Sequence, residues 1–359
     1  MTECWWKTSF GATRVLVIAA PFGFGPRIAA DHLCERLDLA MGAWNKAPMR
    51  LPPGNLRFDV LLNFGVEGTL DLSTHIPFSV WIDCLLWLRD VLPDSAIKHD
   101  LVLGEHFFEL KPNLLLNQPN ILEIQPLYES PSIVPPSETG GLVLVSFGGV
   151  ITPYSTDSHR VGFPHLLLKS ILRASSSRKS PTRVVCCGPP AIINLLSIES
   201  DLSGIMWDAP DRPRYLAYLR ACDILVVQPG LYGPFEAFES YVNTVLSPPF
   251  SCTQIWQSLA FQSNGLMGAV PLLGTLSSAI DGTSFNTESE QLVFSRLDEW
   301  FHTHACSEEV SMQLEDWAGS LLSSSDRSQE MKSRRRTYVE NCRQFPSADE
   351  ILVSHGIVK

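Results

Sequence analysis

The sequence predicts an α/β fold built from two doubly wound domains, and three observations support this prediction. Short apolar segments alternate with segments of helical periodicity along most of the 359 residues, as in parallel sheets covered by helices. The segment 127–140 is rich in Pro and Ser, lacks periodicity and is interpreted as a linker. The alternation begins again at residue 142, so each half has the size of an ordinary domain.

The first half contains apolar segments with the length and composition of buried strands. After the first of them, the segment Arg27–Leu39 has helical spacing, because Ile28, Leu33 and Leu37 share one face. We expect strands at Arg14–Ala20, Phe58–Asn63, Phe78–Ile82 and Ile121–Ile124.

The second half repeats this organisation and ends in a long helical region at residues 289–343. We therefore assign an N-terminal domain to residues 1–135, a C-terminal domain to residues 136–330 and a helical tail to residues 331–359. In the C-terminal domain we expect strands at Leu142–Phe147, Arg183–Cys187, Gly204–Trp207, Ile224–Val227 and Thr244–Leu246, with helices at Arg214–Ala221 and Thr253–Asn264.

Composition and charge argue against several classes of protein. The net charge of −11 disfavours a nucleic-acid partner, because binding to a phosphate backbone needs a basic surface. The one basic run, Lys332–Arg336, lies in a helical segment and is interpreted as a solvated face. The nine cysteines form no Cys-x-x-Cys pair and no zinc spacing with His, which favours a reducing, cytoplasmic location. No apolar segment has the length of a transmembrane helix.

Glycine-rich turns follow the predicted strands, and ligands of doubly wound sheets bind outside the carboxyl ends of the strands. The turn Gly23–Gly25 follows the first strand and leaves the backbone open to a ligand. The turn Ser146–Gly149 has backbone amides that suit a diphosphate. Neither turn matches a dinucleotide fingerprint or a P-loop, since Gly-x-Gly-x-x-Gly and Gly-Lys-Ser/Thr are absent.

A third turn, Gln228–Glu236, joins an apolar strand to a helix that we expect to begin at Pro234. A helix N-terminus attracts phosphate, and the carboxylate of Glu236 in the first turn suits a sugar hydroxyl. The alternatives are an ordinary strand–helix junction and a helix cap. Gln254 follows a Pro-Pro segment and is either close to a donor sugar or an exposed helix residue.

The order of these motifs resembles the GT-B layout of nucleotide-sugar glycosyltransferases over residues 14–270. This resemblance implies two Rossmann-like domains that face each other across a cleft, with a tail that packs back on the N-terminal domain. It implies UDP-sugar donor contacts in the C-terminal domain and acceptor contacts in the N-terminal domain, with no cofactor. The implied donor contacts are Gly148, Gly149, Trp207, Gln228, Pro229, Gly230, Leu231, Glu236 and Gln254, and the acceptor contacts are Phe22, Gly23, Phe24, Gly25 and Trp87.

A narrower resemblance is to cytosylglucuronate synthase of peptidyl-nucleoside antibiotic biosynthesis. It rests on the blocks Ala20–Pro26, Trp81–Trp87 and Pro229–Phe238. It implies that glucuronic acid moves from UDP-glucuronate to a nitrogen of cytosine with inversion, giving cytosylglucuronate and UDP. Two positions depart from the family, since Arg27 stands where a small residue is expected and Phe250 stands where Gln is expected.

The first glycine turn lacks the histidine that many GT-B enzymes use as general base. Asp83 directly follows a predicted strand and Glu67 lies in a second turn, so both are candidate bases. For Asp83 the alternative is an N-cap of the next helix. Arg27 and Arg160 are candidates to bind the carboxylate of an acidic sugar. No Asp-x-Asp metal motif is present, so we expect a metal-independent reaction.

Three other functions stay open on the sequence alone. One is a glycosyltransferase with a hydroxyl acceptor on a lipid or natural product, and another is a UDP-sugar epimerase. The third is a non-catalytic nucleotide-sugar-binding protein, which the missing histidine favours. The expected partners are small-molecule substrates. The sequence does not determine the sugar or the acceptor. It also leaves open whether the protein forms a homodimer.

Overall fold

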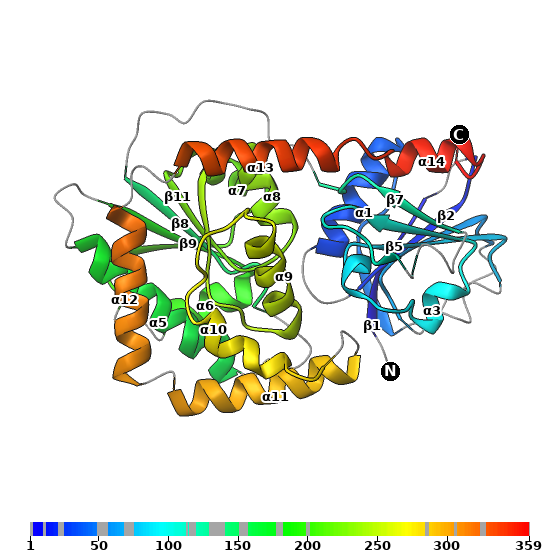
Figure 1. The fold of residues 1–359 in the computed structure, drawn as a ribbon. Coiled ribbons are helices and arrows are strands. Elements are labelled where there is room, and N and C mark those ends of the chain that lie inside the picture. Colours follow the sequence, from blue (N-terminus) through cyan, green and yellow to red (C-terminus); the bar gives the residue numbers. More distant parts are fainter. Residues whose placement is uncertain are drawn as a thin grey trace. The chain divides into compact units, whose positions relative to one another are not determined.

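The computed structural model describes the chain as two compact units (Figure 1). The first unit comprises residues 1–129 and 340–359, and the second comprises residues 130–339. The expected divisions at residues 135 and 330 lie six residues after and nine residues before these boundaries at 129 and 339. The described residues are 3–9, 12–20, 25–48, 57–67, 75–112, 114, 120–128, 141–150, 157–176, 182–198, 202–283, 287–304, 307–323 and 328–358.

The first unit contains a sheet with the strand order β3-β1-β2-β4-β5-β6-β7. From β2 to β7 the neighbouring strands run parallel, whereas β1 pairs antiparallel with β2 and β3. All residues of β2, β4 and β6 are buried, which explains why these segments are mainly apolar. The strands are β1 (Glu3–Thr8), β2 (Val15–Ala19), β3 (Asn45–Pro48), β4 (Val60–Phe64), β5 (Phe78–Asp83), β6 (Leu101–Glu105) and β7 (Ile121–Ile124).

Strands β1, β3 and β6 are absent from the sequence-based prediction. In β1 the side chains alternate, because Cys4 and Trp6 pack with the core around Leu16 and Leu61 while their neighbours face the opposite side. An alternating strand of this kind is not a continuous apolar segment. Strand β1 was therefore missed, whereas β6 is fully buried and was missed because Gly104 and Glu105 interrupt its apolar segment.

Helix α1 (Gly25–Arg36) contacts β2 and β4, and two short helical segments follow β5, namely η1 (Leu86–Leu88) and α3 (Asp94–Ile97). The predicted buried face of α1 is only partly right, since Ile28 and Leu37 are partly exposed. The residues that α1 buries are Ala29, Ala30, Leu33 and Cys34.

The C-terminal segment of the chain packs within the first unit. Its helix α14 (Ala348–Ser354) begins with a capping box. Asp349 pairs with Arg36 of α1 at 2.9 Å, and the Pro346 carbonyl accepts a hydrogen bond from the Gln125 N–H at 3.0 Å. These contacts join the end of the chain to the first helix and the last strand of the unit.

The second unit contains a parallel sheet with the strand order β10-β9-β8-β11-β12. This order is doubly wound, and it reverses between β8 and β11. The predicted strands of this half are confirmed to within one residue at each end, and the α/β class with Rossmann-like sheets is confirmed. The strands are β8 (Leu142–Ser146), β9 (Arg183–Cys187), β10 (Ile205–Asp208), β11 (Ile224–Val227) and β12 (Asn243–Leu246).

Helices connect these strands and continue beyond β12. Helix α12 packs along α5, and Arg173 of α5 pairs with Glu315 of α12. The helical segments are α5 (Asp157–Ser176), α6 (Pro190–Ile198), α7 (Arg212–Ala221), α8 (Tyr232–Glu239), α9 (Cys252–Ser263), α10 (Leu273–Leu276), η2 (Ser277–Ile280), α11 (Thr287–His304), α12 (Glu308–Ser323) and α13 (Ser328–Cys342).

Arg335 of α13 corrects the interpretation of Lys332–Arg336 as a solvated face. Its side chain is buried and donates to the carbonyls of Leu266 at 2.6 Å and Thr244 at 2.9 Å. The guanidinium also lies 4.8 Å from the ring centroid of Phe238. Burial lowers the pKa of Arg335 to about 10. A buried cation with backbone acceptors therefore anchors α13 to the second unit.

The described part of the chain holds no helix that is both long and apolar enough to span a membrane. The described cysteines are free thiols. Cys186 and Cys187 are adjacent in β9, and burial raises the pKa of both thiols. These two residues pack in the core, as their apolar surroundings in the sequence suggest.

His99 is buried in the first unit beside Asn63 and Trp81. Its Nε2 lies 3.3 Å from Asn63 Nδ2, and its ring centroid lies 5.6 Å from that of Trp81. Burial lowers the pKa of His99 to about 4, against the opposing charge of Asp100. The imidazole is therefore neutral near pH 7 in the folded protein.

Replacing Arg335 with Met is expected to destabilise the protein by about 3 kcal/mol, because two buried carbonyls lose a charged donor. Arg334→Met is the matched control, since Arg334 lies on the same helix with a mainly exposed side chain. The control is expected to change the free energy of unfolding by less than about 0.5 kcal/mol. Urea unfolding followed by circular dichroism measures both variants. Equal losses would contradict the anchoring role of Arg335.

The free energy of unfolding is expected to fall by up to about 3 kcal/mol as the pH decreases from 6.5 to about 4. The unfolded chain binds a proton at His99 near pH 6.5, whereas the folded chain binds it only near pH 4. Urea unfolding at stepped pH measures this dependence. His99→Phe is expected to flatten it, and His302→Phe, at an exposed position, is the control. A His99→Phe curve as steep as that of the parent protein would refute the assignment.

Candidate functional site

The candidate site lies in the second unit at the carboxyl ends of β8 and β11, where the strand order reverses. The turns after these strands are neighbours because the strands pair with each other. Gly149 donates its backbone N–H to Gln228 Oε1 at 2.8 Å, and the Gln228 N–H lies 3.4 Å from the Ser146 carbonyl. The fold therefore brings together two of the turns that the sequence singles out.

Gln254 of α9 supports the turn after β8 from a third element. Its Nε2 donates to the Gly149 carbonyl at 3.1 Å, and its Oε1 accepts from the Phe250 N–H at 2.8 Å. Both ends of the amide thus contact backbone groups, and the residue is buried. The alternative of an exposed helix residue is wrong, and Gln254 positions the turn.

One polar atom in this site has no partner within the described residues. Gln228 is only 3% exposed, its Oε1 is used by Gly149, and its Nε2 makes no hydrogen bond there. A buried polar group without a partner costs roughly 1–3 kcal/mol. An oxygen atom of a ligand beside Nε2 would remove this cost.

Glu236 is held by an arginine that the sequence analysis did not identify. The carboxylate is 1% exposed, and it accepts from Arg212 Nη2 at 2.6 Å and from Nη1 at 3.0 Å. This bidentate pair fixes the orientation of both side chains. The Arg212 side chain, at the start of α7, is 29% exposed. The contact of Glu236 with a sugar hydroxyl stays a prediction.

Helix α8 begins earlier than the sequence predicts. The expected first residue is Pro234, whereas the helix begins at Tyr232 and its N-cap is Leu231. The Leu231 side chain makes no capping hydrogen bond, so the first backbone N–H groups of α8 are not used by their N-cap residue and suit an anion. Pro229 and Leu231 are buried and Gly230 is partly exposed.

Trp207 lies near the end of β10, which extends one residue beyond the predicted strand, to Asp208. Trp207 is partly exposed, and its contact with a nucleobase stays a prediction. Asp208 pairs with Arg214 at 2.8 Å and accepts from the Tyr218 hydroxyl at 2.7 Å. A polar network therefore follows the end of this strand.

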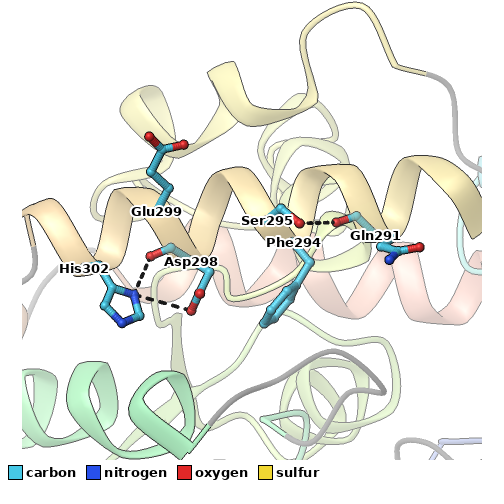
Figure 2. A pocket seen from close by; sticks show the side chains of 6 residues that line it. All are labelled: Gln291, Phe294, Ser295, Asp298, Glu299 and His302. Carbon is cyan, nitrogen blue, oxygen red and sulfur yellow. Dashed lines mark hydrogen bonds and ion pairs between the residues drawn. The ribbon is translucent and has the colours of Figure 1, made fainter.

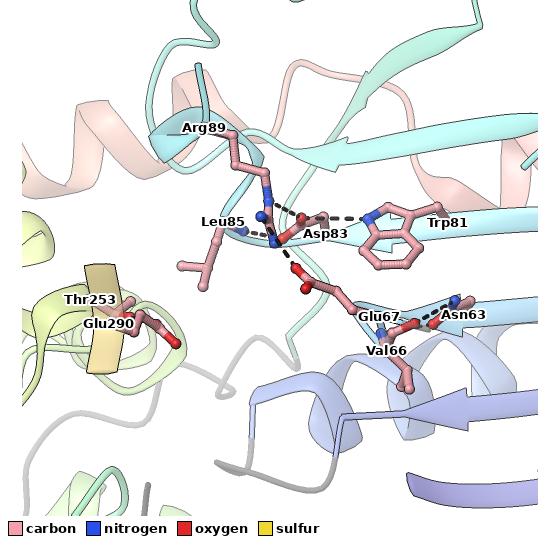
Figure 3. Close-up of polar contacts among 9 residues, drawn as sticks. All are labelled: Asn63, Val66, Glu67, Trp81, Asp83, Leu85, Arg89, Thr253 and Glu290. Atoms are coloured by element: carbon pink, nitrogen blue, oxygen red, sulfur yellow. Dashed lines mark hydrogen bonds and ion pairs between the residues drawn. The ribbon is translucent and has the colours of Figure 1, made fainter. Parts of the chain in front are cut away.

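In the first unit, both candidate bases contact one arginine (Figure 3). Asp83 is buried at the end of β5, and its Oδ2 accepts from Arg89 Nε at 2.9 Å. Glu67 Oε1 lies 3.6 Å from Arg89 Nη1, and the Glu67 side chain is 45% exposed. Asp83 Oδ1 also accepts from the Leu85 N–H at 2.8 Å. Asp83 thus caps the turn after β5. This role resembles the helix N-cap that the sequence left open as the alternative to a general base.

Trp87 of η1 is a packed residue rather than an open stacking surface. Its ring centroid lies 4.5 Å from that of Phe108, and its Nε1 donates to the Cys84 carbonyl at 3.1 Å. The residue is buried. Its contact with an acceptor stays a prediction.

Gly25 and Arg27 begin helix α1. The guanidinium of Arg27 lies 4.6 Å from the ring centroid of Trp5 and 5.6 Å from that of Trp44. Three of the predicted acceptor contacts lie outside the described residues, namely Phe22, Gly23 and Phe24. The side chain of Arg160, the second predicted cation for a sugar carboxylate, also lies outside them.

A hollow in the second unit lies along one face of α11 (Figure 2). None of the predicted site residues lines it. Across the residues with described positions, no cluster of His, Cys, Asp and Glu has an arrangement suited to a metal ion. The hollow is lined by Gln291, Phe294, Ser295, Asp298, Glu299 and His302.

Gly149→Ala is expected to destabilise the second unit by about 1–3 kcal/mol, because the new methyl group overpacks the turn. A Cβ at this position would lie 3.0 Å from Gln254 Nε2 and 3.5 Å from Gln228 Oε1. Gly148→Ala is the matched control, since a Cβ there meets no described atom within 4 Å. Thermal unfolding measures both variants, and equal midpoints would contradict the tight packing at Gly149.

No protein-family model and no curated protein sequence matches the chain. Spinosyn rhamnosyltransferase SpnG complexed with thymidine diphosphate is 13% identical with a TM-score of 0.47, covering 92% of this chain and 80% of that one. Arabidopsis thaliana UGT89C1 complexed with UDP is 15% identical with a TM-score of 0.41, covering 89% and 78%. Acinetobacter baumannii MurG is 11% identical with a TM-score of 0.37, covering 80% and 74%. The Rossmann-like assignment therefore rests on the strand order of each unit.

Proposed function

We propose that the protein is a glycosyltransferase that takes its sugar from a UDP-sugar. The observation that carries this proposal is the junction of the turns after β8 and β11, with Gln228 Nε2 left without a partner among the described residues. The amide of Gly148 and the N-terminus of α8 suit the oxygens of a diphosphate. The Gly149 N–H already contacts Gln228 Oε1, and the side-chain amide of Gln228 supplies a further donor at this junction.

The proposed reaction is a displacement at the anomeric carbon. The acceptor atom attacks from the face opposite to the nucleotide, the bond to the diphosphate oxygen breaks, and the configuration inverts. The electron pair moves to the diphosphate, where backbone N–H groups and Arg212 stabilise the charge. The acceptor proton passes to Glu67 or Asp83, of which Glu67 is the more exposed. The chain has no Asp-x-Asp motif, so we assign the stabilisation to the protein's own groups.

In its narrowest form, the proposal is transfer of glucuronic acid from UDP-glucuronate to a nitrogen of cytosine. The sequence resemblance in three blocks supports this form, as do Arg27 and Arg160 as cations for an acidic sugar. A hydroxyl acceptor on a lipid or natural product is the alternative within the same enzyme class. The mass of the product distinguishes these acceptors.

A second candidate is a nucleotide-sugar-binding protein without catalytic activity. The observation that favours it is the contact of both candidate bases with Arg89. Both Asp83 oxygens already accept hydrogen bonds, from Arg89 and from the Leu85 N–H. If this second candidate is right, the nucleotide sugar binds but no product forms.

Calorimetric titration with UDP, UDP-glucuronate and UDP-glucose is expected to give saturable binding, because the second unit supplies the diphosphate contacts. After addition of cytosine to the UDP-glucuronate sample, mass spectrometry is expected to detect cytosylglucuronate. Binding without any product from cytosine or hydroxyl acceptors would favour the non-catalytic candidate. Absence of UDP binding would refute the glycosyltransferase proposal.

Gln228→Glu is expected to weaken UDP binding by at least about tenfold. The variant keeps an oxygen for the Gly149 N–H, but it replaces the amide donor with a charge that repels a diphosphate. Gln262→Glu adds the same charge to a partly exposed position of α9 and is expected to change the affinity by less than about twofold. If the two variants bind UDP equally well, the proposed location of the diphosphate is wrong.

A further inference from the structure

An aromatic and cationic cluster lies on one side of β1 and β3 in the first unit. Antiparallel pairing places Trp5 of β1 opposite Lys46 of β3, and α1 contributes side chains to the same side. We call this group the Trp5–Trp44 cluster, and it consists of Trp5, Lys7, Arg27, Asp31, Trp44 and Lys46.

Arg27 occupies the centre of this cluster. Its guanidinium lies over the rings of Trp5 and Trp44, at 4.6 and 5.6 Å from their centroids. A cation over an indole ring is stabilised by about 0.5–2 kcal/mol, depending on how far it is desolvated. Contact with two rings restricts the conformations of the Arg27 side chain. A guanidinium that stacks on a ring uses its flat face, so the N–H groups in its plane can still donate hydrogen bonds.

The carboxylate best placed to pair with Arg27 is already engaged. Asp31 lies four residues further along α1, on the same side of the helix. It pairs with Lys7 instead, and its two oxygens accept from Trp44 Nε1 at 3.1 and 3.2 Å. Within the described chain, Arg27 makes only its two contacts with tryptophan rings and has no carboxylate partner.

Further positive charge lies around the same two rings. Lys7 Nζ is 4.7 Å from the ring centroid of Trp44, and Lys46 Nζ is 6.0 Å from that of Trp5. The cluster thus combines three cations with one carboxylate, in a chain whose net charge is −11. An anion is attracted to such a local excess of positive charge.

We propose that Arg27, held between Trp5 and Trp44, is the centre of a binding site for an oxyanion, namely a carboxylate or phosphate group of a substrate. The planar guanidinium matches such groups in a bidentate geometry, and the two rings reduce the entropy lost on binding. The link to a substrate rests on the proposed function. Under it, the oxyanion belongs either to an acidic donor sugar or to an anionic acceptor.

The test uses the full chain labelled with ¹⁵N-arginine and follows the Nε–H signal of Arg27 by NMR. The signal is identified by its loss in Arg27→Lys. Inorganic phosphate and acetate are titrated separately at constant ionic strength, with chloride as the balancing anion. A saturable shift of the Arg27 signal with phosphate or acetate is expected. Absence of a saturable shift with both anions, or an equal shift with chloride, would overturn the proposal.

Two variants test the construction of the site. Trp5→Leu removes one ring and is expected to weaken the binding of the anion at Arg27 by about tenfold. Lys98→Gln removes an exposed cation of the first unit that is not part of the cluster, and it is expected to change the affinity by less than about twofold. Equal weakening in both variants would indicate a general charge effect and would contradict a site built around Arg27.

Nucleotide sugars then identify the source of the oxyanion. A shift with UDP-glucuronate that UDP-glucose does not produce assigns the site to the donor carboxylate. A response to phosphate or acetate without a response to either nucleotide sugar assigns it to an anionic acceptor. UDP affinity, measured on the same samples, reports on the second unit. Normal UDP binding without an anion response rejects only this inference, whereas an anion response without UDP binding rejects the glycosyltransferase proposal and keeps the site.

Discussion

The backbone of Gly149 is the point on which the candidate nucleotide site depends. Its N–H is held by Gln228 and its carbonyl by Gln254, so the turn after β8 is joined to β11 and to α9. A Cβ at this position would lie tightly against the Gln254 amide, which favours glycine there. The same contacts use one end of the Gln228 amide and leave the other without a partner in the described chain. The polar group proposed to contact a ligand is therefore a product of the way in which the turn is built.

Arginine side chains hold the acidic residues that the sequence marks as functional. Arg212 binds both oxygens of Glu236 in the second unit, and Arg89 contacts Asp83 and Glu67 in the first. The loss of the cation from a buried ion pair is strongly destabilising, so the pairs of Glu236 and Asp83 contribute to the structure of α8 and of the turn after β5. Arg212, whose side chain is partly exposed, supplies a cation to the proposed diphosphate site. A structural ion pair and a binding role are thus compatible in one residue.

The antiparallel strands β1 and β3 extend the first sheet beyond its parallel part. They supply Trp5 and Lys46 to the side on which α1 places Arg27. A purely parallel sheet that began at β2 would leave Arg27 without the Trp5 ring. The proposed oxyanion site is therefore a consequence of this extension.

The sequence by itself determined the parallel core and the positions of the glycine turns. Strands buried on both faces, such as β8 and β11, are short apolar segments that can be recognised locally. The alternating strand β1 and the strand β6, which contains Gly104 and Glu105, lack this signal. Only the tertiary structure decided the side-chain partners, because Arg212 and Glu236 are separated by 24 residues. Likewise, the burial of Arg335 depends on carbonyls far away in the chain. The apolar composition that marks a buried strand is a property of its own residues, whereas an ion pair depends on distances that the whole fold sets.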